Sequence, residues 1–299
     1  MSMGFNAAMQ LGARRLIAKP QMLFLVAAFA IRLQADAAEA DRDDFNRYLQ
    51  GRYVFKSQCA PCHGETGRGN GPWAAEMSVK PRNFRMGIFK YRSTPMGHQP
   101  TDDDLRRTIK RGVSGTAMPT FAKTLSNRDL DAILVYLKNL SRRWQEDSRI
   151  SPATELPDPP KWFSQTNERR ERAQAGRRLF AQTCVSCHGD TGAGDGLASK
   201  GLTNVWGQVA VPADLRVEHH RSGPGRSDLF RTISLGLDGT PMVGFRGALK
   251  DQQIWELVAA IEQLPLQEKE ASTEVEASGQ RANNDGKKIR PSSPRRPTP

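Results

Sequence analysis

The stretch Cys59-Ala60-Pro61-Cys62-His63-Gly64 decides the architecture of this 299-residue chain, because it returns 125 residues later as Cys184-Val185-Ser186-Cys187-His188-Gly189. All four cysteines of the chain lie in these two Cys-x-x-Cys-His motifs. A repeat of this length predicts that each half of the chain is one copy of the same structural unit. The chain is long enough for two domains, each with its own buried core.

The sequence around the motifs repeats as well. A glycine and a phenylalanine precede each motif at the same distances, as the two pairs Gly51 with Phe55 and Gly176 with Phe180. Further along, residues 104–121 and 228–245 agree at ten of eighteen positions, now 124 residues apart. Because the match extends over both halves, the duplication covers whole domains rather than the motifs alone.

Both copies are predicted to be helical, which makes the fold class all-α, with two tandem domains and long loops that wrap a bound group. A middle helix begins near Thr101, whose hydroxyl can form a capping box with Asp104. The last helix of each copy carries an apolar stripe at spacings of three and four residues. The stripes are Leu130, Ile133, Leu134, Leu137 and Leu140, then Ile254, Leu257, Val258, Ile261 and Leu264. Ser126 can cap the first of these helices, whereas Lys250 at the matching position cannot.

The ends of the chain differ from its centre. Residues 1–40 are predicted to be a secretory signal, with a basic start, the apolar run 22–31 and small-residue sites before Ala38 or Asp41. An uncleaved signal that tethers the protein is the alternative. The first domain is expected over 41–147, a Pro-rich linker over 148–168 and the second domain over 169–266. Residues 267–299 are too polar to form a core, and are predicted to be a disordered tail.

The two cysteine motifs predict two covalently attached haem c groups. Residues three apart lie on one face of a helical turn, so both sulfurs of a motif can reach the same flat macrocycle. The haem groups are therefore expected to be bound through Cys59 and Cys62, and through Cys184 and Cys187. The adjacent His63 and His188 are then the proximal ligands of the two irons.

Cysteine pairs also occur in three other kinds of site. A thioredoxin-like redox pair requires a βαβ setting, a zinc site requires paired ligand clusters, and an exported chain can form structural disulfides. The histidine that follows directly in both copies favours haem over all three.

The sixth iron ligands are predicted to be Met118 and Met242. Both lie in matching Gly-Thr-x-Met segments, 55 residues after His63 and 54 after His188. Methionine with histidine is a standard pair of axial ligands in c-type haem proteins. Met86 and Met96 do not recur and are expected to be packing or surface residues. The rival ligands are His98, His219 and His220, and the adjacent pair keeps this alternative open for the second half.

Two further pairs of residues have candidate roles near the haem groups. The carbonyls of Pro81 and Pro212 are candidates to orient the two iron-binding histidines, although ordinary loop prolines explain them equally well. Arg107 and Arg231 are candidates to pair with haem propionates, although a solvated helix face is the commoner place for an arginine.

On these residues the chain resembles the class I c-type cytochromes in their diheme, tandem-domain form. The resemblance covers about residues 41–266. It implies that Gly51 and Gly176 let the first helix of each domain cross the last one closely. It also implies that an aromatic residue packs at this crossing. Tyr136 fits this role, whereas Ala260 stands at the matching position of the second domain.

A methionine–histidine pair leaves no open position on the iron, which favours a periplasmic electron carrier over an enzyme. The alternatives are a diheme redox enzyme, either peroxidase-like or oxidising sulfur compounds, and a haem subunit of a membrane oxidase complex. The net charge of +12 predicts redox partners with acidic docking faces and not nucleic acid, for which the chain offers no context. Membrane contact is expected only through an uncleaved signal or a partner complex.

Overall fold

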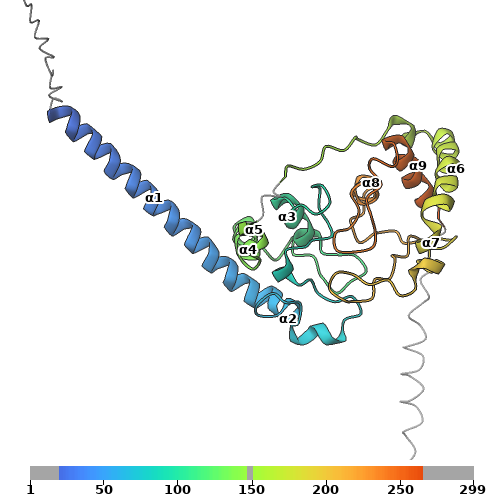
Figure 1. Ribbon diagram of the computed structural model, residues 1–299, viewed down its shortest axis with the longest axis horizontal. Helices are drawn as coiled ribbons and strands as arrows, with labels where there is room; N and C mark the ends of the chain where they lie inside the picture. The colour runs from blue at the N-terminus through green and yellow to red at the C-terminus, as the bar shows by residue number, and fades with distance from the viewer. Residues whose placement is uncertain (1–19, 147–150, 265–299) are drawn as a thin grey trace, which may run out of the picture. The chain divides into compact units, whose positions relative to one another are not determined.

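The computed structural model of the protein describes residues 20–146 and 151–264 (Figure 1). The first nineteen residues of the predicted signal and the whole predicted tail over 267–299 lie outside this range. The elements within it are all helical, with three isolated β-bridges and no strand. The all-α prediction is therefore confirmed. Within the same ranges, no helix combines the length and the apolar character that a membrane span requires.

The described residues divide into two compact units that do not follow the repeat boundary. The first unit contains residues 20–87 and 122–146, and the second contains 88–121 and 151–264. The segment 88–121 belongs to the first repeat by sequence, yet it packs with the second repeat. The predicted ligand Met118 is in this segment.

The first unit is built on a crossing of two helices. Helix α1 (Pro20–Val54) continues as the π-helix η1 (Phe55–Cys59) and then α2 (Ala60–His63), and Figure 1 shows α1 as one long helix. It packs against α4 (Asn127–Asn139), which is followed by α5 (Arg143–Glu146). Two 3-10 turns, η2 (Pro72–Glu76) and η3 (Phe84–Met86), lie in the loop after α2. No helix break separates the predicted signal from the residues that follow it.

The crossing in the first unit depends on a missing side chain. A Cβ on Gly51 would lie 2.0 Å from the carbonyl oxygen of Ala132 and 3.0 Å from Cβ of Tyr136. Tyr136 is buried at this point and its ring centroid lies 5.1 Å from that of Phe55. Ser126 is the predicted N-cap of α4, and it forms a capping box there with Asp129. The local sequence therefore fixes where α4 begins, and Gly51 fixes where α1 crosses it.

The second unit repeats this crossing with other residues. Helix α6 (Thr166–Thr183) leads into α7 (Val185–His188) and packs against α9 (Asp251–Ile261). A Cβ on Gly176 would lie 1.9 Å from the Glu256 carbonyl oxygen and 3.0 Å from Cβ of Ala260. Ala260 thus occupies the place of Tyr136. The aromatic core lies elsewhere, where Trp255 stacks on Phe230 with ring centroids 4.3 Å apart.

The second unit contains four further elements. They are α3 (Asp102–Arg111), the 3-10 turns η4 (Lys161–Ser164) and η5 (Leu197–Ser199), and α8 (Arg226–Leu235). Thr101 and Asp104 form the predicted capping box at the start of α3. Trp162 and Phe163 of η4, which fall within the predicted linker, are buried in the core cluster. The chain before them runs without helix and is held where Thr154 N donates to Ser93 O at 2.7 Å.

Candidate haem-binding sites

Both Cys-x-x-Cys-His motifs adopt the same local structure. Cys59 and Cys184 are the N-cap residues of the one-turn helices α2 and α7, with nearly equal backbone angles (φ −114° and −115°). The second cysteine and the histidine follow on that turn, so both sulfurs of each motif lie within one helical turn. No disulfide joins the four cysteines.

The local environment keeps the first cysteine of each motif in its thiol form. Burial, with a smaller contribution from Cys62, raises the pKa of Cys59 to about 12. Burial also raises the pKa of Cys184, against a smaller opposing effect of its hydrogen bond with Thr183. A buried neutral thiol is a poor nucleophile and a poor metal ligand, because the thiolate is the reactive form. The first cysteine of each motif thus differs from the activated thiolates of redox and zinc sites.

Each motif histidine is fixed by a backbone carbonyl. Nδ1 of His63 lies 3.0 Å from Arg82 O, and Nδ1 of His188 lies 3.2 Å from Ala213 O. A carbonyl oxygen only accepts hydrogen bonds, so Nδ1 carries the proton and donates the hydrogen bond. Nε2 then keeps its lone pair, which is the form of imidazole that binds a metal.

The expectation that Pro81 and Pro212 supply these carbonyls is wrong by one residue in both copies. Their carbonyl oxygens instead face two glycines, where a Cβ on Gly69 or Gly194 would lie 2.5 Å from Pro81 O or Pro212 O. Both glycines have positive φ angles, 76° and 83°, a region that favours glycine. The proline carbonyl is therefore turned onto the glycine, and the next carbonyl points at the histidine.

Burial also favours the metal-binding form of the histidines. It lowers the pKa of His63 and of His188, in each case against a smaller opposing effect of the backbone hydrogen bond. The ring of His63 stacks on Phe84 with ring centroids 4.5 Å apart. In the second unit Leu215 takes the equivalent place, since Leu215 N donates to Gly192 O as Phe84 N donates to Gly67 O.

The segments that contain Met118 and Met242 have the same hydrogen bonds, which defines two methionine loops, 113–118 and 237–242. Val113 N donates to Met118 O at 3.1 Å, and Leu237 N donates to Met242 O at 2.9 Å. The threonine of each Gly-Thr-x-Met segment accepts from the methionine N–H at 3.2 Å in both loops. Each methionine is half-buried. Two loops of equal construction thus present one methionine each.

The rival ligands have no such symmetry. His98 is half-buried, and its Nδ1 is enclosed without a hydrogen-bond partner. His219 and His220 line a cavity of the second unit that Met118 also lines, and Met242 does not line it. Met86 and Met96 are partly exposed, at 37% and 47%.

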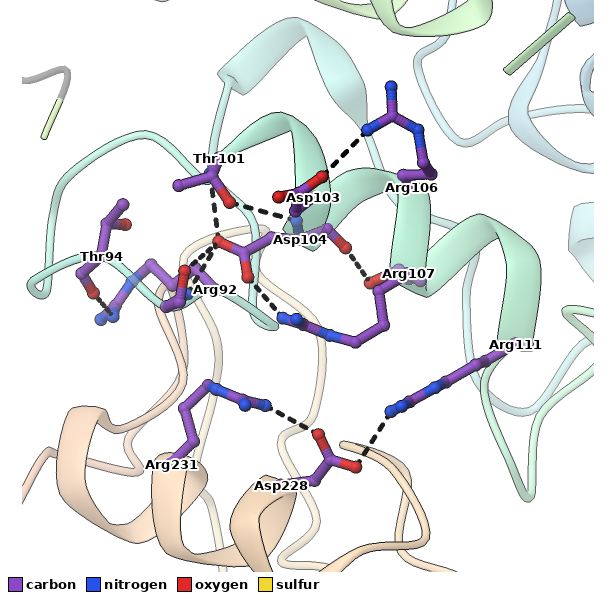
Figure 2. Close-up of polar contacts among 12 residues, drawn as sticks. Arg92, Thr94, Thr101, Asp103, Asp104, Arg106, Arg107, Arg111, Asp228 and Arg231 are labelled. Atoms are coloured by element: carbon purple, nitrogen blue, oxygen red, sulfur yellow. Dashed lines mark hydrogen bonds and ion pairs between the residues drawn. The ribbon is translucent and has the colours of Figure 1, made fainter. Parts of the chain in front are cut away.

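That cavity has a volume of about 490 Å³ and is strongly basic. Its lining includes the arginines Arg92, Arg107, Arg111, Arg221 and Arg231. Figure 2 shows that Arg107 and Arg231, the candidate propionate partners, each pair with an aspartate three residues earlier. Both arginines thus lie beside a cavity rather than on a plain solvated face, as the cavity lining shows.

The sequence indicated Asp104 only as part of a capping box, and Asp228 only as the first residue of the repeated segment 228–245. Asp104 is fully buried and accepts hydrogen bonds from Ser93, Thr101 and Arg107. Asp228 is buried and accepts from Gly225 N, Arg111 and Arg231. The repeated Asp-Leu-x-Arg-Thr segments carried this signal, since an Asp and an Arg three apart face each other on a helix.

These observations fit a haem group at each motif. Each offers two thiols on one turn and a histidine of the correct tautomer. Among residues 20–146 and 151–264, no group of three or more His, Cys, Asp or Glu side chains is arranged to bind a metal ion. When bound, the haem iron supplies a centre that alternates between two oxidation states.

Comparison with known families supports this assignment. The family "Cytochrome C oxidase, cbb3-type, subunit III" matches residues 46–137, and the family "Cytochrome c" matches residues 173–265. Each match covers one cysteine motif.

Two curated relatives are oxidase subunits. The cbb3-type cytochrome c oxidase subunit CcoP of Rubrivivax gelatinosus is 26% identical over 204 residues, which is 68% of this chain and 52% of that protein. The subunit FixP of Azorhizobium caulinodans is 28% identical over 160 residues, or 52% of this chain and 44% of that protein. The chain thus spans about half the length of the curated relatives that it matches.

A solved structure is similar over most of both chains. It is a chain of the Kuenenia stuttgartiensis reducing HAO-like protein complex, with a TM-score of 0.65 and 31% sequence identity. The similarity covers 72% of this chain and 96% of that one. Two tandem cytochrome c-type domains with two covalently bound haem c groups therefore place this chain among the diheme class I c-type cytochromes.

Proposed function

We propose that this diheme electron-transfer cytochrome works as a periplasmic carrier, with Cys59, Cys62, Cys184 and Cys187 attaching the haem groups. His63 and Met118 bind one iron, and His188 and Met242 bind the other. The observation that carries the proposal is the equal construction of the two methionine loops. Neither iron then offers an open position, so each centre gains and loses electrons without making or breaking bonds.

The residues around each site restrict the movement of the iron ligands. Arg82 O and Ala213 O fix the plane and the tautomer of the two histidines. The hydrogen bonds inside the methionine loops fix the backbone of Met118 and Met242. A site that changes little between its two redox states reorganises little when an electron moves. Arg107 and Arg231, already oriented by aspartates, would pair with the negative propionates of a bound haem.

The domain limits proposed here are 1–40 for a cleaved signal, 41–147 and 169–266 for the haem domains, 148–168 for the linker and 267–299 for the tail. Export to the periplasm agrees with haem attachment after translocation. The net charge of +12 supports partners with acidic docking faces. Their rate of electron exchange with this protein falls as salt rises, because ions screen the attraction.

Substitution of the methionines tests the ligand assignment. Met242→Ala opens one haem per chain to carbon monoxide, and Met118→Ala opens the other, whereas the wild type binds none. Met86→Ala is the matched control, since that exposed methionine is expected to leave both haems closed. Carbon monoxide binding by the wild type, or turnover of peroxide, would overturn the carrier and favour an enzyme.

A second candidate function is that of a haem subunit in a larger redox complex. It is favoured by the names of the relatives, two oxidase subunits and one member of an HAO-like complex. The chemistry of the two sites is the same in both cases and only the partner differs. Affinity purification of the tagged protein from its own cells distinguishes them: stable co-elution of oxidase or oxidoreductase subunits supports the complex, and elution alone supports the carrier.

A further inference from the structure

An arginine of the first repeat forms hydrogen bonds and an ion pair at the methionine loop of the second repeat. The side chain of Arg92 is fully buried, and its Nη2 donates to Asp238 Oδ1 at 2.7 Å and to Leu235 O at 3.0 Å. Gly97 N donates to both oxygens of the same carboxylate, at 3.2 and 3.1 Å. These four bonds, all inside the second unit, are named the Arg92 clamp.

Asp238 belongs to the methionine loop that ends at Met242. Next to it, Leu237 O accepts from the N–H and from the hydroxyl of Thr240, at 3.1 and 2.7 Å. That hydroxyl oxygen in turn accepts from Met242 N. The backbone of Met242 is therefore connected to Arg92 through hydrogen bonds at the base of the loop. Arg92 also bonds the carbonyl of Leu235, the last residue of α8, and so holds the chain where it enters the loop.

The segment that carries Arg92 is itself held on both sides. Arg92 also donates to the carbonyl of Thr94, a contact drawn in Figure 2. Ser93 donates to the buried Asp104 of α3, and Thr154 N donates to Ser93 O. Met96 reaches Gly236, where a Cβ would come within 2.5 Å of its terminal methyl carbon. The clamp therefore has a rigid support.

Within the part of the chain that the structure describes, the first methionine loop has no equivalent of this clamp. At the offset of 124 residues, Ser114 stands in place of Asp238 and Arg111 in place of Leu235. Ser114 is exposed. The two loops, otherwise alike, thus differ in whether a buried ion pair holds their base.

Net stability is a weak explanation for such a pair. Desolvation offsets much of the attraction in a buried ion pair, and Nε of Arg92 is buried without a partner. The same pair fixes geometry, because removal of one member leaves the other charge buried and uncompensated. A geometric role for a loop that presents an iron ligand accounts for both observations.

We infer that Arg92 is a positioning residue that holds Met242 on the second haem iron, whereas no such ion pair among the described residues holds the loop of Met118. The inference rests on the proposed function, in which Met242 is an iron ligand. It makes ligand retention at the second haem depend on a residue of the first repeat, 150 positions earlier in the sequence.

The test measures carbon monoxide binding to the reduced, full-length holoprotein. Arg92→Ala makes binding at one haem per chain at least about tenfold faster, because loss of one partner of a buried pair shifts the loop toward its open form. Arg92→Lys retains the charge and restores most of the closure. Arg226→Ala is the matched control, since it removes another arginine ion pair of the same unit, with Glu262 at 2.7 Å, outside the loop.

Combination with the methionine variants identifies the haem. The double variant Arg92→Ala with Met242→Ala should bind carbon monoxide at one haem per chain, like Met242→Ala alone, because that haem is already open. The double variant Arg92→Ala with Met118→Ala should bind it at both haems. A closed Arg92→Ala protein, or opening of the haem of Met118, overturns the inference. If Met242→Ala leaves both haems closed, the ligand assignment fails and the clamp fails with it.

Two more variants guard against misfolding. Asp238→Ser gives the second loop the residue of the first, and the double variant Arg92→Met with Asp238→Ser leaves no buried charge unpaired. Both are expected to open the same haem as Arg92→Ala. Retention of a closed haem in the double variant shows that the pair does not position Met242, and overturns the inference.

Discussion

Arg111, the last residue of α3, donates a hydrogen bond from Nη1 to Oδ2 of Asp228, in the first turn of α8, over 3.0 Å (Figure 2). The two residues are 117 positions apart in the sequence. The other carboxylate oxygen of Asp228 accepts from Arg231 at 2.7 Å. Asp228 therefore joins two helices of the second unit, one from each repeat, besides bonding Gly225 N at the start of its own helix.

Loss of Asp228 should therefore cost more stability than loss of Arg111. Asp228→Ala is expected to lower the free energy of unfolding by about 2–3 kcal/mol, because charge-assisted bonds from several donors disappear together. Arg111→Ala should cost less than about 1 kcal/mol, because its side chain is 48% exposed and water screens the pair. Urea unfolding of the holoprotein, followed by circular dichroism, measures both. Equal losses would contradict this assignment of roles.

Gly176 should not tolerate a methyl group. Gly176→Ala places Cβ 1.9 Å from the Glu256 carbonyl oxygen, so α6 and α9 must move apart. Overpacking of this kind typically costs about 1–3 kcal/mol, and here the obstacle is backbone. Gln174→Ala, at an exposed position of the same helix, is the control and should change stability by less than about 0.5 kcal/mol. Thermal unfolding of the two variants compares them, and equal midpoints would contradict the close crossing.

Features set by neighbouring residues were predictable from the sequence. The capping box at Thr101 and the N-cap at Ser126 were predicted, because the residues that form such caps lie close together in the sequence. The crossing at Gly51 followed from the resemblance to a known family. The carbonyls that hold the histidines were misplaced by one residue, because only the backbone angles at Gly69 and Gly194 decide which carbonyl points inward.

Features set by distant residues were not predictable. Arg92 and Asp238 lie 146 positions apart, and comparison of the repeats gives no signal because Ser114 replaces the aspartate. Trp162 and Phe163 lie in a Pro-rich context that indicates a linker, yet both are buried in the core of the second unit. Only the packing of the folded chain reveals their burial.

Removal of the signal is testable by intact mass. Cleavage at either small-residue site starts the mature chain at Ala38 or Asp41. Because α1 runs from Pro20 to Val54 without a break, cleavage would leave α1 with fewer turns before its crossing with α4. Mass spectrometry of protein from a host that installs haem c should give the processed chain plus two haems. A mass that includes residues 1–37 would show that the signal is retained.

The hydrogen bond from His188 to Ala213 O should set the potential of one haem. Gly194→Ala places a Cβ 2.5 Å from Pro212 O, so the Pro212 carbonyl must move. Because Ala213 follows directly, its carbonyl is expected to shift away from Nδ1 of His188. An imidazole that donates a weaker hydrogen bond gives less electron density to the iron, which stabilises the oxidised state less. One of the two midpoint potentials is therefore expected to rise, while the other stays unchanged.

Gly201→Ala is the matched control for this experiment. Gly201 has a positive φ of 77°, and a Cβ there meets nothing within 4 Å. This variant therefore brings a similar backbone strain without displacing the carbonyl. A spectroscopic redox titration compares the two proteins, and resonance Raman reports the iron–histidine bond directly. If both substitutions shift the potential equally, backbone strain explains the change and the carbonyl of Ala213 does not tune the haem.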